Sequence, residues 1–169
     1  MFSKQRNSCD FLKMGKDKYF LARAIEIAGI SIKNGGGPFG AVISKNGEKI
    51  SEASNKVVLT HDPTAHAEIL AIRAASSLLN SHDLSECTLY SSCEPCPMCL
   101  GAIYWAGIKK VVYASDRSDA EEAGFSDKMI YEEISLDPAN RKILFLRLND
   151  AGGNEVFKKW NEFEGKSVY

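Results

Sequence analysis

The spacing of apolar side chains along the chain predicts an alternation of helices and strands. Apolar positions at helical intervals predict an amphipathic helix over residues 19–30, which the glycine-rich segment 34–38 ends. Short apolar runs bounded by polar or glycine-containing segments predict strands. The predicted strands are 39–44, part of 49–59, 86–91, 110–114 and 143–148, and the remaining predicted helices are 65–75, 98–106 and 155–163.

The order of these elements indicates the fold class. Asn46 and Gly47 form a typical hairpin turn, so the strands on either side of them should pair antiparallel. The helix at 98–106 lies between two strands, and such a connection joins parallel strands by a right-handed crossover. We therefore expect one α/β domain over residues 1–169, a three-layer α/β/α architecture around a mixed sheet. Residues 1–16 show no clear pattern and are expected to form a flexible N-terminal extension.

Composition narrows the class of protein. Of the 169 residues, 44% are hydrophobic and 25% charged, which is ordinary for a globular domain with a sizeable core. No apolar run reaches the ~18 residues of a membrane span, and the N-terminus has no apolar signal region. The net charge of −1 gives no electrostatic footprint for nucleic acid, so a small neutral substrate fits better. The five cysteines, three of them crowded together, favour reduced thiols and a cytoplasmic location.

Two short fragments contain the candidate chemistry, a His-Ala-Glu fragment at 66–68 and a Pro-Cys-Pro-Met-Cys fragment at 95–99. Zinc binds nitrogen and sulfur ligands in a tetrahedron, and a catalytic zinc site keeps its fourth position for water. His66, Cys96 and Cys99 would supply the three protein ligands. Both fragments open predicted helices, whose N-termini favour ionised thiols.

Glu68 stands two residues after the predicted histidine ligand, in a helix that Asp62 is placed to cap. Two residues correspond to about 200° around a helix, which suits a group that contacts the bound water and does not bind the metal. A positioned carboxylate can take a proton from that water and later give it to another group. We therefore predict Glu68 as the catalytic acid and base, with Zn²⁺ as the only cofactor.

The cysteines also allow other interpretations. A C-x-x-C pair by itself is as often structural zinc, and Cys93, Cys96 and Cys99 also begin a ferredoxin-type iron–sulfur pattern. That pattern needs a further cysteine where the chain has Ala102, and it leaves the histidine and glutamate unexplained. We expect Cys93 to be a small packed residue at the end of a strand.

The chain resembles the cytidine deaminase superfamily across nearly its whole length. The two fragments match the H-x-E and P-C-x-x-C signature of zinc-dependent nucleobase deaminases. Within the superfamily, the segments 62–68, 92–106, 122–125 and 166–169 are similar to bacterial-type guanine deaminases. The resemblance implies zinc-dependent hydrolysis of guanine to xanthine and ammonia in purine salvage or catabolism.

The resemblance also implies further site residues. Asn55 matches the asparagine that hydrogen-bonds the purine, Phe39 the aromatic residue beside the base, and Asp127 an acid proposed as a second proton shuttle. Without the resemblance, Asn55 could be a turn former and Phe39 a core side chain. Asp127 could be a helix cap or a surface charge.

The C-terminal region is expected to act on the active site. The resemblance implies a homodimer in which this segment crosses to cover the partner's site. Residues 151–169 match the lid, with small residues at 151–154 as a hinge, and Tyr169 matches the tyrosine over the base. The sequence leaves open whether the lid covers its own site or that of the partner.

Three alternative functions stay open. A guanosine deaminase would share the zinc motifs and a terminal tyrosine, and the depth of the pocket beyond the base would distinguish it. A tRNA adenosine deaminase agrees less well with the neutral charge and the extended C-terminal region. A non-catalytic zinc or iron–sulfur binding module would leave Glu68 as an accident. The sequence does not decide between guanine, guanosine and other amino-substituted rings such as ammeline.

Overall fold

The computed structural model describes the backbone of residues 8–149 and 152–168, and their side chains from residue 15 onwards. The chain divides into two compact units, residues 1–127 and 128–169. The interpretation of the chain as a single domain therefore stays a prediction.

The first unit alternates helices and strands. Its elements are α1 (Ser8–Lys33), β1 (Gly40–Lys45), β2 (Glu48–Ser54), α2 (Val57–Thr60), α3 (Ala67–Leu79), β3 (Cys87–Cys93), α4 (Pro97–Trp105), β4 (Lys110–Ser115) and α5 (Arg117–Glu122). The strands form a four-stranded sheet in the order β2-β1-β3-β4. β3 and β4 are parallel and the other neighbours are antiparallel, so the mixed sheet is confirmed.

The β1–β2 hairpin turns at the predicted Asn-Gly pair. Asn46 and Gly47 have φ values of 54° and 78°. Lys45 and Glu48 pair directly on either side of them. Two consecutive residues with positive φ make the turn whose twist matches that of the strands, and asparagine and glycine adopt this conformation most readily.

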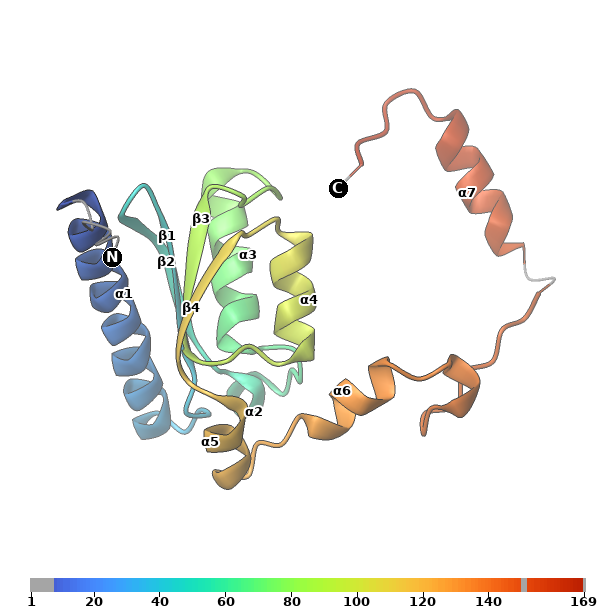
Figure 1. Cartoon of the computed structure of the whole chain (residues 1–169). Coiled ribbons are helices and arrows are strands. Elements are labelled where there is room, and N and C mark those ends of the chain that lie inside the picture. Colours follow the sequence, from blue (N-terminus) through green and yellow to red (C-terminus); the bar gives the residue numbers. More distant parts are fainter. Residues whose placement is uncertain (1–7, 150–151, 169) are drawn as a thin grey trace, which may run out of the picture. The chain divides into compact units, whose positions relative to one another are not determined.

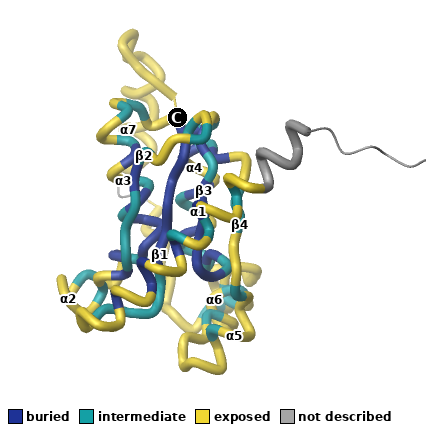
Figure 2. Tube along the Cα trace, turned by 90° about the vertical axis from the view of Figure 1, so that its left-hand side faces the viewer, coloured by how far each residue is buried: buried dark blue, intermediate teal, exposed yellow. Residues whose placement is uncertain are grey.

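Alternation along the central strands builds a helical layer on each face of the sheet. Ala41 and Ile43 of β1 belong to a core cluster with residues of α3 and α4. Val42, between them, packs with α1, because successive side chains of a strand point to opposite faces. Figure 1 shows α1 on one side of the sheet and α3 and α4 on the other. β1 and β3 form the buried centre (Figure 2), and the three-layer α/β/α architecture is confirmed.

Helix α1 begins earlier than the apolar pattern indicates. Residues 8–16 are helical, in the segment where the sequence predicts a flexible extension, and residues 1–7 lie outside the described part. Polar contacts hold this end of the helix to the sheet. The Tyr90 hydroxyl donates to the Asp17 carboxylate at 2.9 Å, and the Lys110 ammonium donates to it at 2.6 and 2.8 Å. The spacing of apolar residues does not record polar contacts, so it could not predict this end of the helix.

The second unit contains α6 (Lys128–Ile134), the 3-10 turn η1 (Pro138–Asn140) and α7 (Gly153–Glu162). None of its described residues is buried. Helix α7 confirms the helix predicted at 155–163, but the strand predicted at 143–148 is wrong, because these residues form no regular element. Apolar composition favours a strand, yet a strand exists only where a neighbour supplies its hydrogen bonds, and no described strand pairs with this segment.

The predictions about membrane spans and cysteine thiols can be compared with the described part of the chain. No helix there combines the length and apolar character needed to cross a membrane. Cys87, Cys93, Cys96 and Cys99 are all free thiols.

Candidate metal centre and substrate site

Two helices present the predicted metal ligands at their first residues. His66 is the N-cap of α3 and Cys96 the N-cap of α4, both with extended backbone, and Cys99 lies in the first turn of α4. Pro97 occupies the first helical position, where its fixed φ suits a helix start. The unpaired N–H groups of a helix start favour negative charge, so this placement stabilises thiolates.

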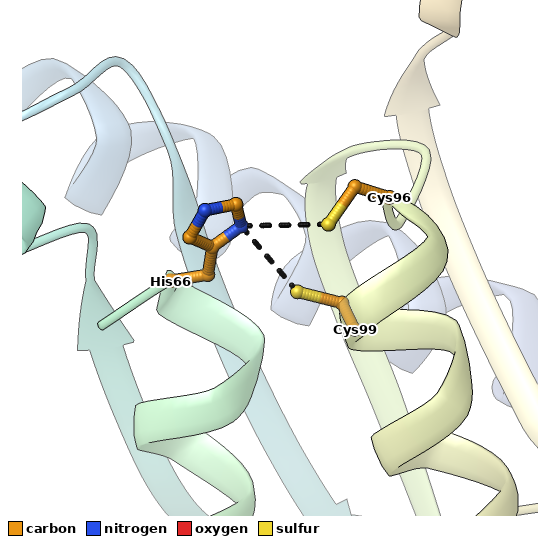
Figure 3. A group of neighbouring side chains, drawn as sticks. All are labelled: His66, Cys96 and Cys99. Atoms are coloured by element: carbon orange, nitrogen blue, oxygen red, sulfur yellow. Dashed lines mark hydrogen bonds between the residues drawn. The ribbon is translucent and has the colours of Figure 1, made fainter. Parts of the chain in front are cut away.

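The start of α3 differs from the predicted one. The helix begins two residues later than the pattern indicates, at Ala67, and Asp62 does not cap it. Asp62 instead accepts hydrogen bonds from the backbone N–H (2.8 Å) and hydroxyl (2.7 Å) of Thr64, a local turn typical of aspartate. His66 therefore lies just before the helix, and its ring points toward α4 (Figure 3).

The three ligand atoms converge between the two helix starts. His66 Nδ1 lies 3.5 Å from Cys96 Sγ and 3.6 Å from Cys99 Sγ. The three atoms are all within 4.8 Å of one another. A tetrahedral zinc ion, with bonds of about 2.0–2.1 Å to nitrogen and about 2.3 Å to sulfur, would hold such N and S atoms about 3.6 Å apart. The arrangement therefore fits zinc.

The two thiols do not ionise alike. The hydrogen bond from Cys99, helped by that of His66, lowers the pKa of Cys96 to about 4. The same contact with Cys96, together with burial, raises the pKa of Cys99. The hydrogen bond with Cys96 also raises the pKa of the His66 ring. A divalent cation would remove this competition for protons, because it favours both thiolates at once.

Glu68 points into the same site from the first turn of α3. Its Oε2 lies 3.5 Å from Cys99 Sγ, and its Oε1 accepts a hydrogen bond from the Ser91 hydroxyl at 3.0 Å. The angle of about 200° that two residues of a common helix would have does not apply, because His66 precedes the helix. Burial raises the pKa of the Glu68 carboxyl. A buried carboxyl group with a raised pKa is suited to hold and release a proton.

Ser91 was not singled out from the sequence. It is 1% exposed and shares the core-facing side of β3 with Cys87 and Leu89. A polar side chain at an inward position of a buried strand needs a hydrogen-bond partner. That break in the apolar alternation is the signal that could have identified it.

Asn55 and Phe39 are joined through the backbone. The Asn55 N–H donates to the Phe39 carbonyl at 3.0 Å, and the Lys56 N–H donates to the Ala65 carbonyl at 2.9 Å. The second bond ties the end of β2 to the segment that leads into α3. Asn55 is 6% exposed, and its Oδ1 accepts a hydrogen bond from the Val57 N–H at 3.2 Å. The asparagine is thus both a turn former and a buried neighbour of the metal-ligand segment.

Phe39 borders a small cavity. Its ring meets that of Phe125 edge-on, with centroids 5.0 Å apart. Both rings line a cavity of about 160 Å³, together with Cys93 and Ser115 near the ends of β3 and β4. Phe39 also packs against the core on the α3 side of the sheet, so it has both a core contact and an accessible face.

Cys93 is packed at the end of β3, as predicted, and stays outside the metal-ligand cluster. Its thiol donates to the Asp116 carbonyl at 3.4 Å, and burial raises its pKa to about 11. The iron–sulfur interpretation needs Cys93 beside Cys96 and Cys99, so its position outside the cluster argues against that interpretation.

Asp127 ends the first unit and is partly buried. Burial raises the pKa of its carboxyl, Arg117 opposes that rise, and the negative charge of Cys96 adds to it. The influence of Cys96 indicates that Asp127 lies within electrostatic reach of the metal ligands. Tyr169, the remaining predicted site residue, lies outside the described residues.

Known proteins resemble this chain over most of its length. The family model for the cytidine and deoxycytidylate deaminase zinc-binding region matches residues 14–115. The guanine deaminase of Bacillus subtilis is 49% identical over 151 residues, which is 89% of this chain and 97% of that protein. An X-ray structure of guanine deaminase from Bacillus subtilis has a TM-score of 0.88 at 48% identity, covering 90% of this chain and 98% of the other.

Other deaminases match a smaller share of the chain. The tRNA-specific adenosine deaminase of Aquifex aeolicus is 46% identical over 102 residues, 60% of this chain and 67% of that protein. A solved guanine deaminase from Nitrosomonas europaea has a TM-score of 0.62 at 36% identity, covering 64% of each chain. The likeness is therefore most extensive, among these three proteins, to the Bacillus enzyme.

Proposed function

The chain belongs to the cytidine and deoxycytidylate deaminase family, and we propose that it hydrolyses guanine to xanthine and ammonia in purine salvage or catabolism. The observation that carries the chemistry is the buried Glu68 carboxylate, 3.5 Å from a thiol of the His/Cys/Cys cluster. The choice of guanine is supported by the 49% identity to the Bacillus subtilis guanine deaminase over nearly all of both chains.

Zn²⁺ is the proposed cofactor, held by His66, Cys96 and Cys99. When bound, it would act as a Lewis acid that brings the pKa of a water molecule close to neutrality. The separations of 3.5 and 3.6 Å between Nδ1 and the two sulfur atoms support this choice.

Glu68 is the proposed carrier of protons. Hydrolysis puts an oxygen atom from water on the ring carbon and removes the amine, so both protons of the water must reach the base or the leaving group. The carboxylate takes the first proton from the attacking water and passes it to a ring nitrogen. It then moves the second from the new hydroxyl group to the amine, which leaves as ammonia. The hydrogen bond from Ser91 holds Oε1, which leaves Oε2 on the side of the ligand thiol.

Three other residues are proposed to serve the substrate. Asn55 would hydrogen-bond the purine, and Phe39 would lie beside the base, where its cavity-facing ring offers an apolar surface. Asp127 would act as a second proton shuttle. Its raised pKa and its electrostatic reach to Cys96 support that role.

We further propose that residues 151–169 form a lid, with Tyr169 over the base, and that two copies form a homodimer. The second unit supports this, because Leu144, Phe157 and other apolar side chains are exposed and none of its described residues is buried. Such a segment is expected to cover another surface. That surface is the first unit of the same chain or of the partner.

The remaining partner predictions concern the cellular setting. We propose a cytoplasmic protein that binds a small purine and no nucleic acid. The free thiols of the described cysteines support a reducing compartment, and the net charge of −1 supports a neutral substrate.

Ammonia release tests the proposal directly. The purified protein is assayed with guanine, guanosine, adenine, cytosine, cytidine, ammeline and a tRNA transcript, and zinc is measured on the same sample. Guanine should react fastest, with about one zinc per chain. A preference for guanosine would assign the chain to the nucleoside deaminases. A preference for the tRNA would favour the function of the Aquifex aeolicus relative, which is 46% identical over the shared region.

A further inference from the structure

The segment that follows α1 folds back against Asn55. Ser31, near the end of α1, is 3% exposed. Its backbone carbonyl accepts hydrogen bonds from the N–H groups of Asn34 at 3.0 Å and Gly36 at 2.9 Å. Its hydroxyl donates to the backbone carbonyl of Asn55 at 3.3 Å. One buried serine therefore joins the helix end, the glycine segment and the residue after β2.

Two glycines pack so closely here that a side chain would not fit without a shift. A Cβ at Gly36 would overlap the Ser31 hydroxyl and stand 2.7 Å from the Asn55 carbonyl oxygen. A Cβ at Gly37 would lie 3.1 Å from both Cγ and Oδ1 of the Asn55 side chain. Ordinary carbon contacts are about 3.5–4.0 Å. Gly36 therefore packs on the main chain of the asparagine, and Gly37 packs on its amide group.

The amide group is also oriented from its other side. Its Oδ1 accepts a hydrogen bond from the Val57 N–H at 3.2 Å. The NH₂ group is consequently the branch of the amide that can donate to a ligand. A rotated amide would present its oxygen there, which would accept a hydrogen bond where the present orientation donates one.

We propose that Ser31 and Gly37 are positioning residues that hold the Asn55 amide with its NH₂ group toward the substrate, so that the site selects a ring with a hydrogen-bond acceptor at that place. This rests on the proposed function in one respect, the contact between Asn55 and the purine. A hydrogen bond discriminates between substrates only when its donor cannot rotate to suit the wrong one. An amide fixed before binding also loses less rotamer freedom when the substrate arrives.

The first test is Gly37→Ala, whose added Cβ would have its three nearest atoms in the Asn55 side chain. Because a misplaced contact of about 1 Å can lower efficiency ~10²-fold, we expect kcat/KM for guanine to fall roughly 10- to 100-fold, mainly through KM. Zinc content should be unchanged. Gly29→Ala is the matched control, since its Cβ would meet no atom within 4 Å and its kinetic constants should equal those of the wild type.

The second test separates positioning from a general loss of stability. Ser31→Ala and Gly37→Ala are each combined with Asn55→Ala. If both residues act through the asparagine, neither adds a further loss of kcat/KM once its side chain is gone. Losses that multiply in the double variants would overturn the proposal and indicate a structural role.

Failure of the proposed function has a different signature. It would appear in the wild type as absence of guanine turnover, and the double-variant comparison would then use whichever base of the substrate panel reacts. A crystal structure of Gly37→Ala needs no turnover at all. We expect the hydrogen bond of 3.2 Å between Val57 N and Oδ1 to be broken or lengthened. An amide that stays in place would overturn the inference whatever the substrate.

Discussion

The metal-ligand site and the second unit differ in what holds them. Glu68 is fixed by its helix and again by the Ser91 hydroxyl of a neighbouring strand, and the His66 ring meets both cysteines of a second helix. In the second unit, the contacts are local, such as the ion pair of 2.6 Å between Glu155 and Lys158 three residues apart. The first unit therefore contains all three candidate metal ligands, whereas no residue that the structure describes in the second unit is buried.

Removing one of the candidate metal ligands should produce the largest effect. All three lie in the first unit. In Cys99→Ala two protein ligands remain, so we expect zinc and all measurable ammonia release to be lost. Zinc per chain is measured after purification. Cys87→Ala is the control, because Cys87 is buried but lies outside the ligand cluster, and this variant should keep its zinc. Stoichiometric zinc in Cys99→Ala would refute the ligand assignment.

Glu68→Gln should lower turnover without loss of metal. The amide keeps the shape and the hydrogen bond from Ser91 but cannot accept a proton, so kcat should fall by the ~10²–10⁴ typical of a positioned acid–base group. Steady-state kinetics and zinc content on one sample provide the measurement. Near-normal turnover would remove Glu68 from the mechanism.

Deleting residues 165–169 should have a smaller effect and tests the proposed lid. We expect unchanged zinc content and a fall in guanine turnover of roughly 10- to 100-fold, the scale of a lost positioning contact. Mixing the shortened chain with full-length Glu68→Gln should restore part of the activity if the two copies exchange lids. Impaired activity without rescue would indicate a lid over its own site, and full activity of the shortened chain alone would rule out a lid.

The same contrast explains which parts of the fold could be predicted. The four strands of the sheet, α3, α4 and α7 follow from apolar spacing, because the pattern records which side chains require burial. The pattern does not record which partner supplies the burial or the hydrogen bonds. It therefore missed the beginning of α1, where Asp17 bonds to two strands, and it placed a strand at 143–148, which has no pairing strand in the described chain.

The candidate site divides in a similar way. Residue type and spacing were enough to propose His66, Glu68, Cys96 and Cys99, because these residues lie in two short fragments with a typical metal-site pattern. The residues that hold them could not be proposed in this way. Ser91 meets Glu68 across 23 positions and Ser31 meets Asn55 across 24, and such contacts exist only once the chain is folded. Ordinary serines and glycines gain their roles from packing.

The smallest expected effect is on thermal stability, from the loss of one ion pair in the first unit compared with the loss of one in the second. Arg23 of α1 makes two hydrogen bonds to the Glu52 carboxylate of β2, of 2.9 and 2.6 Å, and these lower the pKa of Glu52 from 4.5 to about 2. Because the folded-state pKa is the lower one, the pair stabilises the fold above the ordinary glutamate value, and this contribution is lost as the pH falls from 4.5 toward 2. Arg23→Met, which keeps the apolar stem, should lower the melting temperature by roughly 2 °C at pH 7. The difference in melting temperature from the wild type should narrow as the pH falls.

Lys158→Met is the matched control in α7. Both partners of its ion pair are more than 60% exposed and lie in the same helix, so its melting temperature should equal that of the wild type. Equal shifts for the two variants would show that a tie between elements is no stronger here than a surface pair.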